Sequence, residues 1–221
     1  MRIRSRQPGI GINMYELSEQ VTSIEEIRGE IGEVLYTQDT KCIDHIDSLC
    51  RTWIEHSPFV VISTVNKKGL IDVAPKGDPA GSWKVLDDKT VAIPDRPGNN
   101  RADTFQNILD NPRAGLMFII PERREVVRVS GGASIVKDPD LMESMAVDSK
   151  PPALAIIVHV EEAMFHCGKA IVRSNLWKPD QWDSIKGLPT YGQALIEHGK
   201  LADQVDELDV ALKKHERETL Y

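Results

Sequence analysis

The stretch APKGDPAGSWKVLDDKTVAIPDRPGNNRADTFQNI, residues 74–108, holds the pattern that decides the fold. It begins with the end of one strand, over residues 75–78, and continues into two short β-branched segments that flank Asp87-Asp88 and predict a hairpin. A loop rich in proline and glycine follows, and the apolar spacing after it is that of a short helix. This order lacks β-α-β alternation and therefore predicts an antiparallel, barrel-like sheet.

Strand signals continue on both sides of this stretch. Upstream, FVVISTV and LIDVAP flank an Asn-Lys-Lys-Gly turn and predict a β-hairpin. Downstream, AGLMFIIP, EVVRVSGGASIV and LAIIVHV predict three more strands, with a short helix at PDLMESMA between the last two. The prediction is a mainly β chain with flanking helices: a six- to seven-stranded antiparallel split β-barrel.

Helices are expected before and after the sheet. Ser23 and Glu26 have capping-box spacing ahead of one helix, and apolar residues recur at helical spacing from Ile43 to Ile54 for a second. The tail from Tyr191 to Tyr221 is polar and has helical periodicity. The expected organisation is a mobile N-terminal arm over residues 1–22, a split-barrel domain with its N-terminal helices over 23–182, and a C-terminal helical extension over 183–221.

The composition of the chain argues against several classes of protein. The net charge of -7 argues against a nucleic-acid partner, although one basic pocket can still hold a small anion. No apolar run is long enough for a membrane span, and the first residues lack the apolar core of a signal peptide. The three cysteines show no C-x-x-C spacing, so they are expected to be free thiols of a cytoplasmic protein.

The loop before the predicted helix at residues 102–111 is a candidate phosphate site. Arg96, Asn99, Asn100 and Arg101 lie there, and a loop-to-helix junction offers backbone N–H groups, the helix dipole and a guanidinium together. The same residues also fit a surface turn in which Asn99 or Asn100 caps the helix and the arginines are solvated. A cation beside a helix N-terminus is slightly unfavourable unless an anion is present, which makes Arg101 the better candidate.

The ordered motifs APKGDPAG, IPDRPGNNRADTFQNILDNPRAGLMFIIP, RVSGGA and FHCGKAIVRSNLW resemble the FMN-binding split barrels related to pyridoxamine 5'-phosphate oxidase. The resemblance covers residues 43–182. It implies FMN as the cofactor, a homodimer with the flavin between subunits, and oxidoreductase activity. A small-molecule substrate would reduce the flavin, and oxygen or another electron acceptor would reoxidise it.

In that family a Ser-Arg-Lys cluster binds the FMN phosphate, and by resemblance the region of Asn99 to Arg101 takes its place here. Because two asparagines depart from the pattern, a second basic residue is expected, and Lys76, Lys169 and Arg173 are the candidates. Lys76 or Lys169 would also suit the N1/C2 end of the flavin. The expected cofactor-binding residues are Pro75, Lys76, Gly77, Asp78, Pro94, Asp95, Arg96, Asn99, Asn100, Arg101, Arg128, Lys169, Arg173 and Trp177.

Several alternatives remain open at this stage. Arg128 is either beside the cofactor or an exposed strand residue next to a β-bulge. A non-catalytic flavin- or haem-binding module, such as a carrier or sensor, is a second possibility, in which a haem would point to His159 or His166. A cofactor-free scaffold is a third possibility. His159, His166 and Cys167 lack a zinc spacing, so no metal is expected. The substrate-binding segment of the oxidase itself has no counterpart in the tail, and the sequence names neither an acid nor a base.

Overall fold

The computed structural model describes residues 15–221, so most of the expected N-terminal arm lies outside the described residues. The chain forms two compact units, which meet in sequence at Asp39 and Thr40. The first contains α1 (Ile24–Ile31) and α2 (Tyr36–Asp39). As predicted, Ser23 caps α1, and its Oγ accepts the N–H of Glu26 at 3.2 Å.

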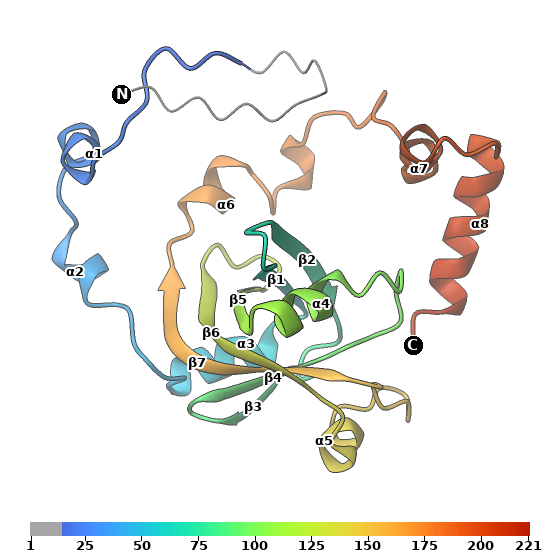
Figure 1. The fold of residues 1–221 in the computed structure, drawn as a ribbon, viewed down its shortest axis with the longest axis horizontal. Helices are drawn as coiled ribbons and strands as arrows, with labels where there is room; N and C mark the ends of the chain where they lie inside the picture. The colour runs from blue at the N-terminus through green and yellow to red at the C-terminus, as the bar shows by residue number, and fades with distance from the viewer. Residues whose placement is uncertain (1–14) are drawn as a thin grey trace. The chain divides into compact units, whose positions relative to one another are not determined.

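The second unit is built on one antiparallel sheet of seven strands (Figure 1). The two edge strands, β2 and β3, are not hydrogen-bonded to each other, so the curved sheet stays open as a split barrel. The predicted fold class is therefore confirmed. The strands run in the order β2-β1-β5-β6-β7-β4-β3, with the bounds β1 (Phe59–Val65), β2 (Ile71–Gly77), β3 (Lys84–Asp87), β4 (Thr90–Pro94), β5 (Arg113–Ile119), β6 (Val126–Val136) and β7 (Ala155–His166).

The first hairpin shows how local sequence sets the register. The Asn66 side chain accepts the N–H groups of Lys68 at 2.9 Å and Leu70 at 3.1 Å, and Gly69 supplies a positive φ of 78°. Only a residue without Cβ takes that conformation at no cost. The turn thus fixes Val65 opposite Ile71, and this register sends alternate side chains of β1 to opposite faces of the sheet.

Helices occupy the connections and the C-terminal region. The second predicted helix begins later than expected, because Asp47 caps it and Ile43 pairs with Ala163 in a β-bridge instead. The tail is helical as predicted, but Lys200 in the left-handed region (φ 51°) divides it into two helices that pack together. The helices of this unit are α3 (Ser48–His56), α4 (Asp103–Asp110), α5 (Pro139–Ser144), α6 (Lys169–Arg173), the 3-10 helix η1 (Pro179–Gln181), α7 (Tyr191–Gly199) and α8 (Val205–Glu218).

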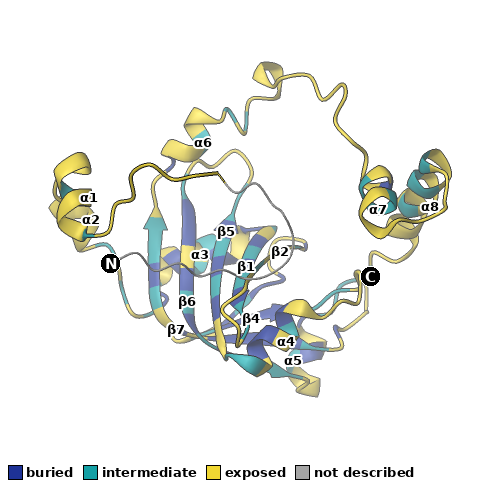
Figure 2. Cartoon of the chain, turned by 45° about the horizontal axis from the view of Figure 1, so that its top comes forward, coloured by how far each residue is buried: buried dark blue, intermediate teal, exposed yellow. Residues whose placement is uncertain are grey.

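The core lies inside the curve of the sheet, where Figure 2 shows the buried strand residues. Val60 and Ile62 of β1 and Phe118 of β5 are fully buried there, together with Ile54 from α3 and Trp83 from the loop before β3. These side chains are large and apolar, and their removal from water is the main stabilising contribution to the domain. Within residues 15–221, every helix is too short or too polar to cross a bilayer.

Candidate functional site

The loop before α4 leads into a helix whose start has no side-chain cap. Asn99 folds the loop by accepting the Arg101 N–H at 3.0 Å, and both Asn100 (φ 56°) and Ala102 (φ 60°) adopt left-handed conformations. Ala102 is the N-cap residue and provides no side-chain hydrogen bond. The expectation that Asn99 or Asn100 caps the helix is therefore wrong, because Asn99 uses its side chain in the turn instead.

This helix start offers donors to an anion. In the part of the chain that the structure describes, no hydrogen-bond acceptor is recorded for the N–H groups of Asp103, Thr104 and Phe105, and such groups bind anions readily. The exposed Arg101 guanidinium lies beside them and donates to the Asp103 carboxylate at 2.7 and 3.3 Å. That hydrogen bond and the charge of Asp103 raise the pKa of Arg101, so the side chain is a permanent cation at this position.

Two polar contacts fix α4 against the strands beneath it. The Thr104 hydroxyl donates to Asp72 of β2 at 3.1 Å, and the buried Asn107 amide donates to the hydroxyl of Thr64 on β1 at 3.0 Å. A buried hydrogen bond is costly to leave unmade, so these contacts hold the helix start in one place. These residues are not predictable from the sequence, since the partners lie far apart along the chain.

Two ion pairs bridge the opening of the split barrel. Lys76 of β2 pairs with Asp95 at 3.1 Å, and Asp78 pairs with Arg96 at 2.7 Å. β2 is one edge of the sheet, whereas Asp95 and Arg96 follow β4, which lies next to the other edge. We call these four residues the seam. The Lys76 ammonium also lies 6.0 Å from the ring centroid of Phe105, which brings it to the first turn of α4.

The second pair of the seam is the more buried one. The Asp78 side chain is 0% exposed and that of Arg96 is 11% exposed. Arg96 also donates to the Met145 carbonyl at 2.8 Å, so two of its donors are engaged inside the protein. A buried carboxylate is stable only when it is paired and hydrogen-bonded, and Arg96 supplies much of that here.

The other predicted residues are spread more widely. Pro75 lies on the exposed face of β2, Gly77 lies beside Phe59, and Pro94 is buried at the end of β4. Trp177 donates its indole N–H to the Arg123 carbonyl at 2.7 Å. Among the described residues, no hydrogen bond or ion pair joins Lys169 and Arg173 of α6, or Arg128 of β6, to the start of α4.

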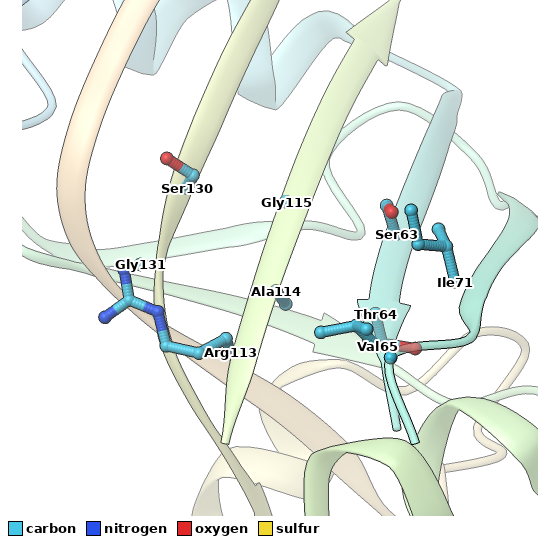
Figure 3. A pocket seen from close by; sticks show the side chains of 10 residues that line it. Ser63, Thr64, Val65, Ile71, Arg113, Ala114, Gly115, Ser130 and Gly131 are labelled. Atoms are coloured by element: carbon cyan, nitrogen blue, oxygen red, sulfur yellow. The ribbon is translucent and has the colours of Figure 1, made fainter. Parts of the chain in front are cut away.

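The open face of the sheet carries a shallow hollow. Ser63, Gly115 and Ser130 lie opposite one another across β1, β5 and β6, and Figure 3 shows them in a row. Two adjoining cavities of about 370 and 220 Å³ share these three small residues. Arg113 lines the larger cavity and Arg128 the smaller one. Because Ser63, Gly115 and Ser130 have small side chains or none, the surface of the sheet is accessible where they lie.

The same face is apolar at its edge. Ile71 and Val73 of β2 are 73% and 62% exposed, although strand residues of this kind are normally covered. They lie opposite Val65 and Ser63 of β1, on the face that points away from the core. Contiguous exposed apolar residues on a sheet are typical of a surface that another molecule covers.

The histidines named as alternatives lie on β7. His159 is exposed opposite Gly132, and His166 ends the strand opposite Val126. Burial lowers the pKa of His166, and the charges of Lys41 and Arg128 lower it further, so its ring is neutral near pH 7. Residues 15–221 contain no group of three or more His, Cys, Asp or Glu side chains placed to hold a metal ion.

The fold and this site define a split-barrel protein with a candidate anion site at the start of a helix. The sequence matches the pyridoxamine 5'-phosphate oxidase family over residues 46–167, more than half of the chain. The chain belongs to this family. A comparison with curated proteins found no match.

Solved structures of similar fold cover about half of the chain or somewhat more. HupZ from Group A Streptococcus is 24% identical, with a TM-score of 0.45 over 53% of this chain and 91% of that chain. An FMN-binding protein from Syntrophomonas wolfei is 14% identical, with a TM-score of 0.43 over 64% and 95%. General Stress Protein 26 from Bacillus anthracis is 17% identical, with a TM-score of 0.40 over 52% and 88%.

Proposed function

We propose that this protein is an FMN-dependent oxidoreductase that holds the FMN phosphate at the start of α4. One observation carries the proposal: the uncapped amides of the first turn and the Arg101 guanidinium lie together at the start of α4. The Lys76 ammonium lies 6.0 Å from the ring centroid of Phe105, a side chain of the same turn. A phosphate monoester is mostly dianionic near neutral pH, and this set offers both hydrogen bonds and positive charge.

The residues present fit a phosphate group. A guanidinium has five N–H donors, and Asp103 engages only two of those of Arg101, so others remain for a phosphate oxygen. Lys76 holds Asp95 through one contact, and an ammonium has three donors. The two contacts beneath α4 keep the amides in position without using them.

When bound, FMN would supply the transfer of hydride or electrons between a small-molecule substrate and an electron acceptor. The chain's own part is to bind and orient the cofactor. Its phosphate would be fixed at α4, and the apolar ring needs a slot of the kind that the open face provides.

A second copy of the chain is the proposed cover for that face. Ile71 and Val73 expose apolar surface on an edge strand, which a homodimer would remove from water. The substitution Val73→Glu is expected to yield a monomer in sedimentation analysis. Val210→Glu, an equally drastic change at an exposed position of α8, is the control and should leave the dimer intact. A Val73→Glu protein that sediments as the wild type would refute this interface.

The phosphate site is tested by comparing FMN with riboflavin, which lacks the phosphate. Arg101→Ala removes charge-assisted hydrogen bonds worth roughly 1.5–3 kcal/mol, so FMN should bind about 10- to 100-fold more weakly while riboflavin is unaffected. Arg217 is an exposed arginine of α8, and Arg217→Ala is the control for the loss of one positive charge. Equal losses for the two ligands would refute the phosphate role.

The redox role needs a separate measurement. The absorption spectrum of the purified protein identifies the ligand, and flavin bands that bleach with a reduced nicotinamide support turnover. Flavin that stays oxidised with every reductant offered would instead support a non-catalytic flavin-binding module. A Soret band would overturn the flavin assignment and direct attention to His159 or His166.

A further inference from the structure

Tyr221 connects the C-terminal helices to the seam. It follows the end of α8 at Glu218 by three residues, and its hydroxyl donates to Oδ1 of Asp78 at 3.0 Å. The Arg96 guanidinium carbon lies 5.6 Å from the centroid of the tyrosine ring. Lys150, in the segment after α5, donates to the backbone oxygen of Tyr221 at 3.0 Å. One residue thus touches three segments that are remote in sequence.

The hydroxyl of Tyr221 completes the coordination of a buried charge. Oδ2 of Asp78 accepts from Arg96, and Oδ1 accepts from Tyr221, so both carboxylate oxygens are satisfied by side chains. The Asp78 side chain is fully buried. An acceptor in that position loses more free energy when its donor is removed than an exposed one would, because water does not replace the donor freely.

The chemical state of the tyrosine agrees with this contact. Burial raises the pKa of Tyr221, and the hydrogen bond and charge of Asp78 raise it further. The phenol therefore keeps its proton and remains a donor. The ring face toward Arg96 adds a cation–π contact, which is also stronger in a desolvated place.

We propose that Tyr221 is a positioning residue that fastens the C-terminal helices to the seam and thereby controls how tightly the cofactor is held. The part concerning the cofactor rests on the proposed function. Tyr221 does not reach the α4 start itself. It acts through the pair Asp78–Arg96, which lies directly beside the pair Lys76–Asp95.

The two ion pairs of the seam are coupled because their residues lie close together along the chain. Lys76 precedes Asp78 by two residues on the same extended segment, and Asp95 precedes Arg96 directly. When Tyr221 leaves, Asp78 loses one of its two donors, and the seam can separate more easily at both pairs. Lys76 still pairs with Asp95 but is then held less firmly near the first turn of α4.

The decisive variants are Tyr221→Phe, which removes only the hydroxyl, and Tyr221→Ala, which also removes the ring. Tyr191→Phe makes the same chemical change at an exposed tyrosine on α7 and serves as the control. Amide hydrogen exchange in the FMN-free protein reports on the seam, through the Asp78 N–H bonded to Pro58 and the Asp95 N–H bonded to Leu154.

We expect these two amides to exchange about tenfold faster in Tyr221→Phe than in the wild type, the change expected for the loss of one hydrogen bond. Tyr191→Phe should leave them unchanged. With FMN bound, the dissociation rate followed by flavin fluorescence should rise several-fold in Tyr221→Phe and further in Tyr221→Ala.

The outcomes separate this inference from the proposed function. Unchanged exchange at both amides in the two Tyr221 variants would overturn the fastening role, whether or not FMN binds. Faster exchange with an unchanged FMN dissociation rate would overturn the control of the cofactor. A wild-type protein that binds no FMN would refute the proposed function and the cofactor part, and the exchange rates would still decide the fastening role.

Discussion

The substitution Arg96→Leu tests whether the seam holds the split barrel together. It removes the guanidinium that pairs with the buried Asp78 at 2.7 Å and leaves a shorter, uncharged side chain. Asp78 then keeps one side-chain donor, the Tyr221 hydroxyl. The Met145 carbonyl also loses the donor that it now has at 2.8 Å.

The expected cost is large because of burial. Breaking a buried ion pair by removing one partner costs about 3–5 kcal/mol. Because Asp78 keeps the hydrogen bond from Tyr221, we expect the cost of Arg96→Leu to lie near the lower limit, at about 3 kcal/mol. For a domain of this size, that corresponds to a fall in Tm of roughly 6–12 °C. The exposed pair Arg113–Glu161, whose side chains are 55% and 53% exposed, is the contrast. Arg113→Leu should cost no more than about 1 kcal/mol.

Urea unfolding of the protein without added flavin, followed by tryptophan fluorescence, measures both costs. The midpoint should fall markedly for Arg96→Leu, with the slope m unchanged. The double variant Arg96→Leu/Asp78→Leu removes the unpaired charge and should be more stable than Arg96→Leu alone. If Arg96→Leu lost no more free energy of unfolding than Arg113→Leu, the structural role of the seam would be refuted.

Three further outcomes follow from single residues. Burial, with a smaller contribution from Asp47, raises the pKa of Cys50 to about 12, so iodoacetamide at pH 8 should leave this thiol unmodified until denaturant is added. Gly131→Ala places a Cβ against the His159 carbonyl oxygen on β7 and should cost about 3 kcal/mol or more in urea unfolding, whereas Gly132→Ala should cost less than about 1 kcal/mol. The raised pKa of Tyr221 means that the folded chain keeps a proton that the unfolded chain releases above its ordinary pKa of about 10. The contribution of the Tyr221 phenol to the free energy of unfolding is therefore fully present below that pH and is lost as the pH rises through the folded pKa. If Tyr221→Phe lost as much stability as the wild type over this pH range, the loss would not come from Tyr221.

The fold was predictable where the signals are local. Alternation in FVVISTV and the Asn66–Gly69 turn predict the first hairpin, and the structure confirms it because the turn and the alternation agree on one register. The strands β5, β6 and β7 are equally clear in their β-branched runs. The helix expected from Ile43 is a different case, since helical spacing there competes with a β-bridge to Ala163 that only tertiary structure reveals.

The sequence names the residues of the seam as candidates, but it does not predict their contacts. Lys76, Asp78, Asp95 and Arg96 were all named from the sequence, yet nothing in their spacing shows which carboxylate pairs with which cation. The capping expectation failed because asparagine side chains also stabilise turns, and Asn99 does so here. Tyr221 was missed, since its partner Asp78 lies 143 residues away along the chain.

The seam gives a physical reason for the proposed cofactor site to lie at the opening of the split barrel. A closed barrel satisfies every strand edge with backbone hydrogen bonds, whereas this sheet leaves β2 and β3 unpaired with each other. Side-chain ion pairs hold the opening instead, and such pairs present charged groups that a ladder of backbone hydrogen bonds does not. Lys76 is the clearest example, because it both pairs across the seam and reaches the first turn of α4. If the proposed cofactor site is correct, the same groups that keep the sheet from opening further are the ones that bind the anion, so binding and stability should respond together to changes at the seam.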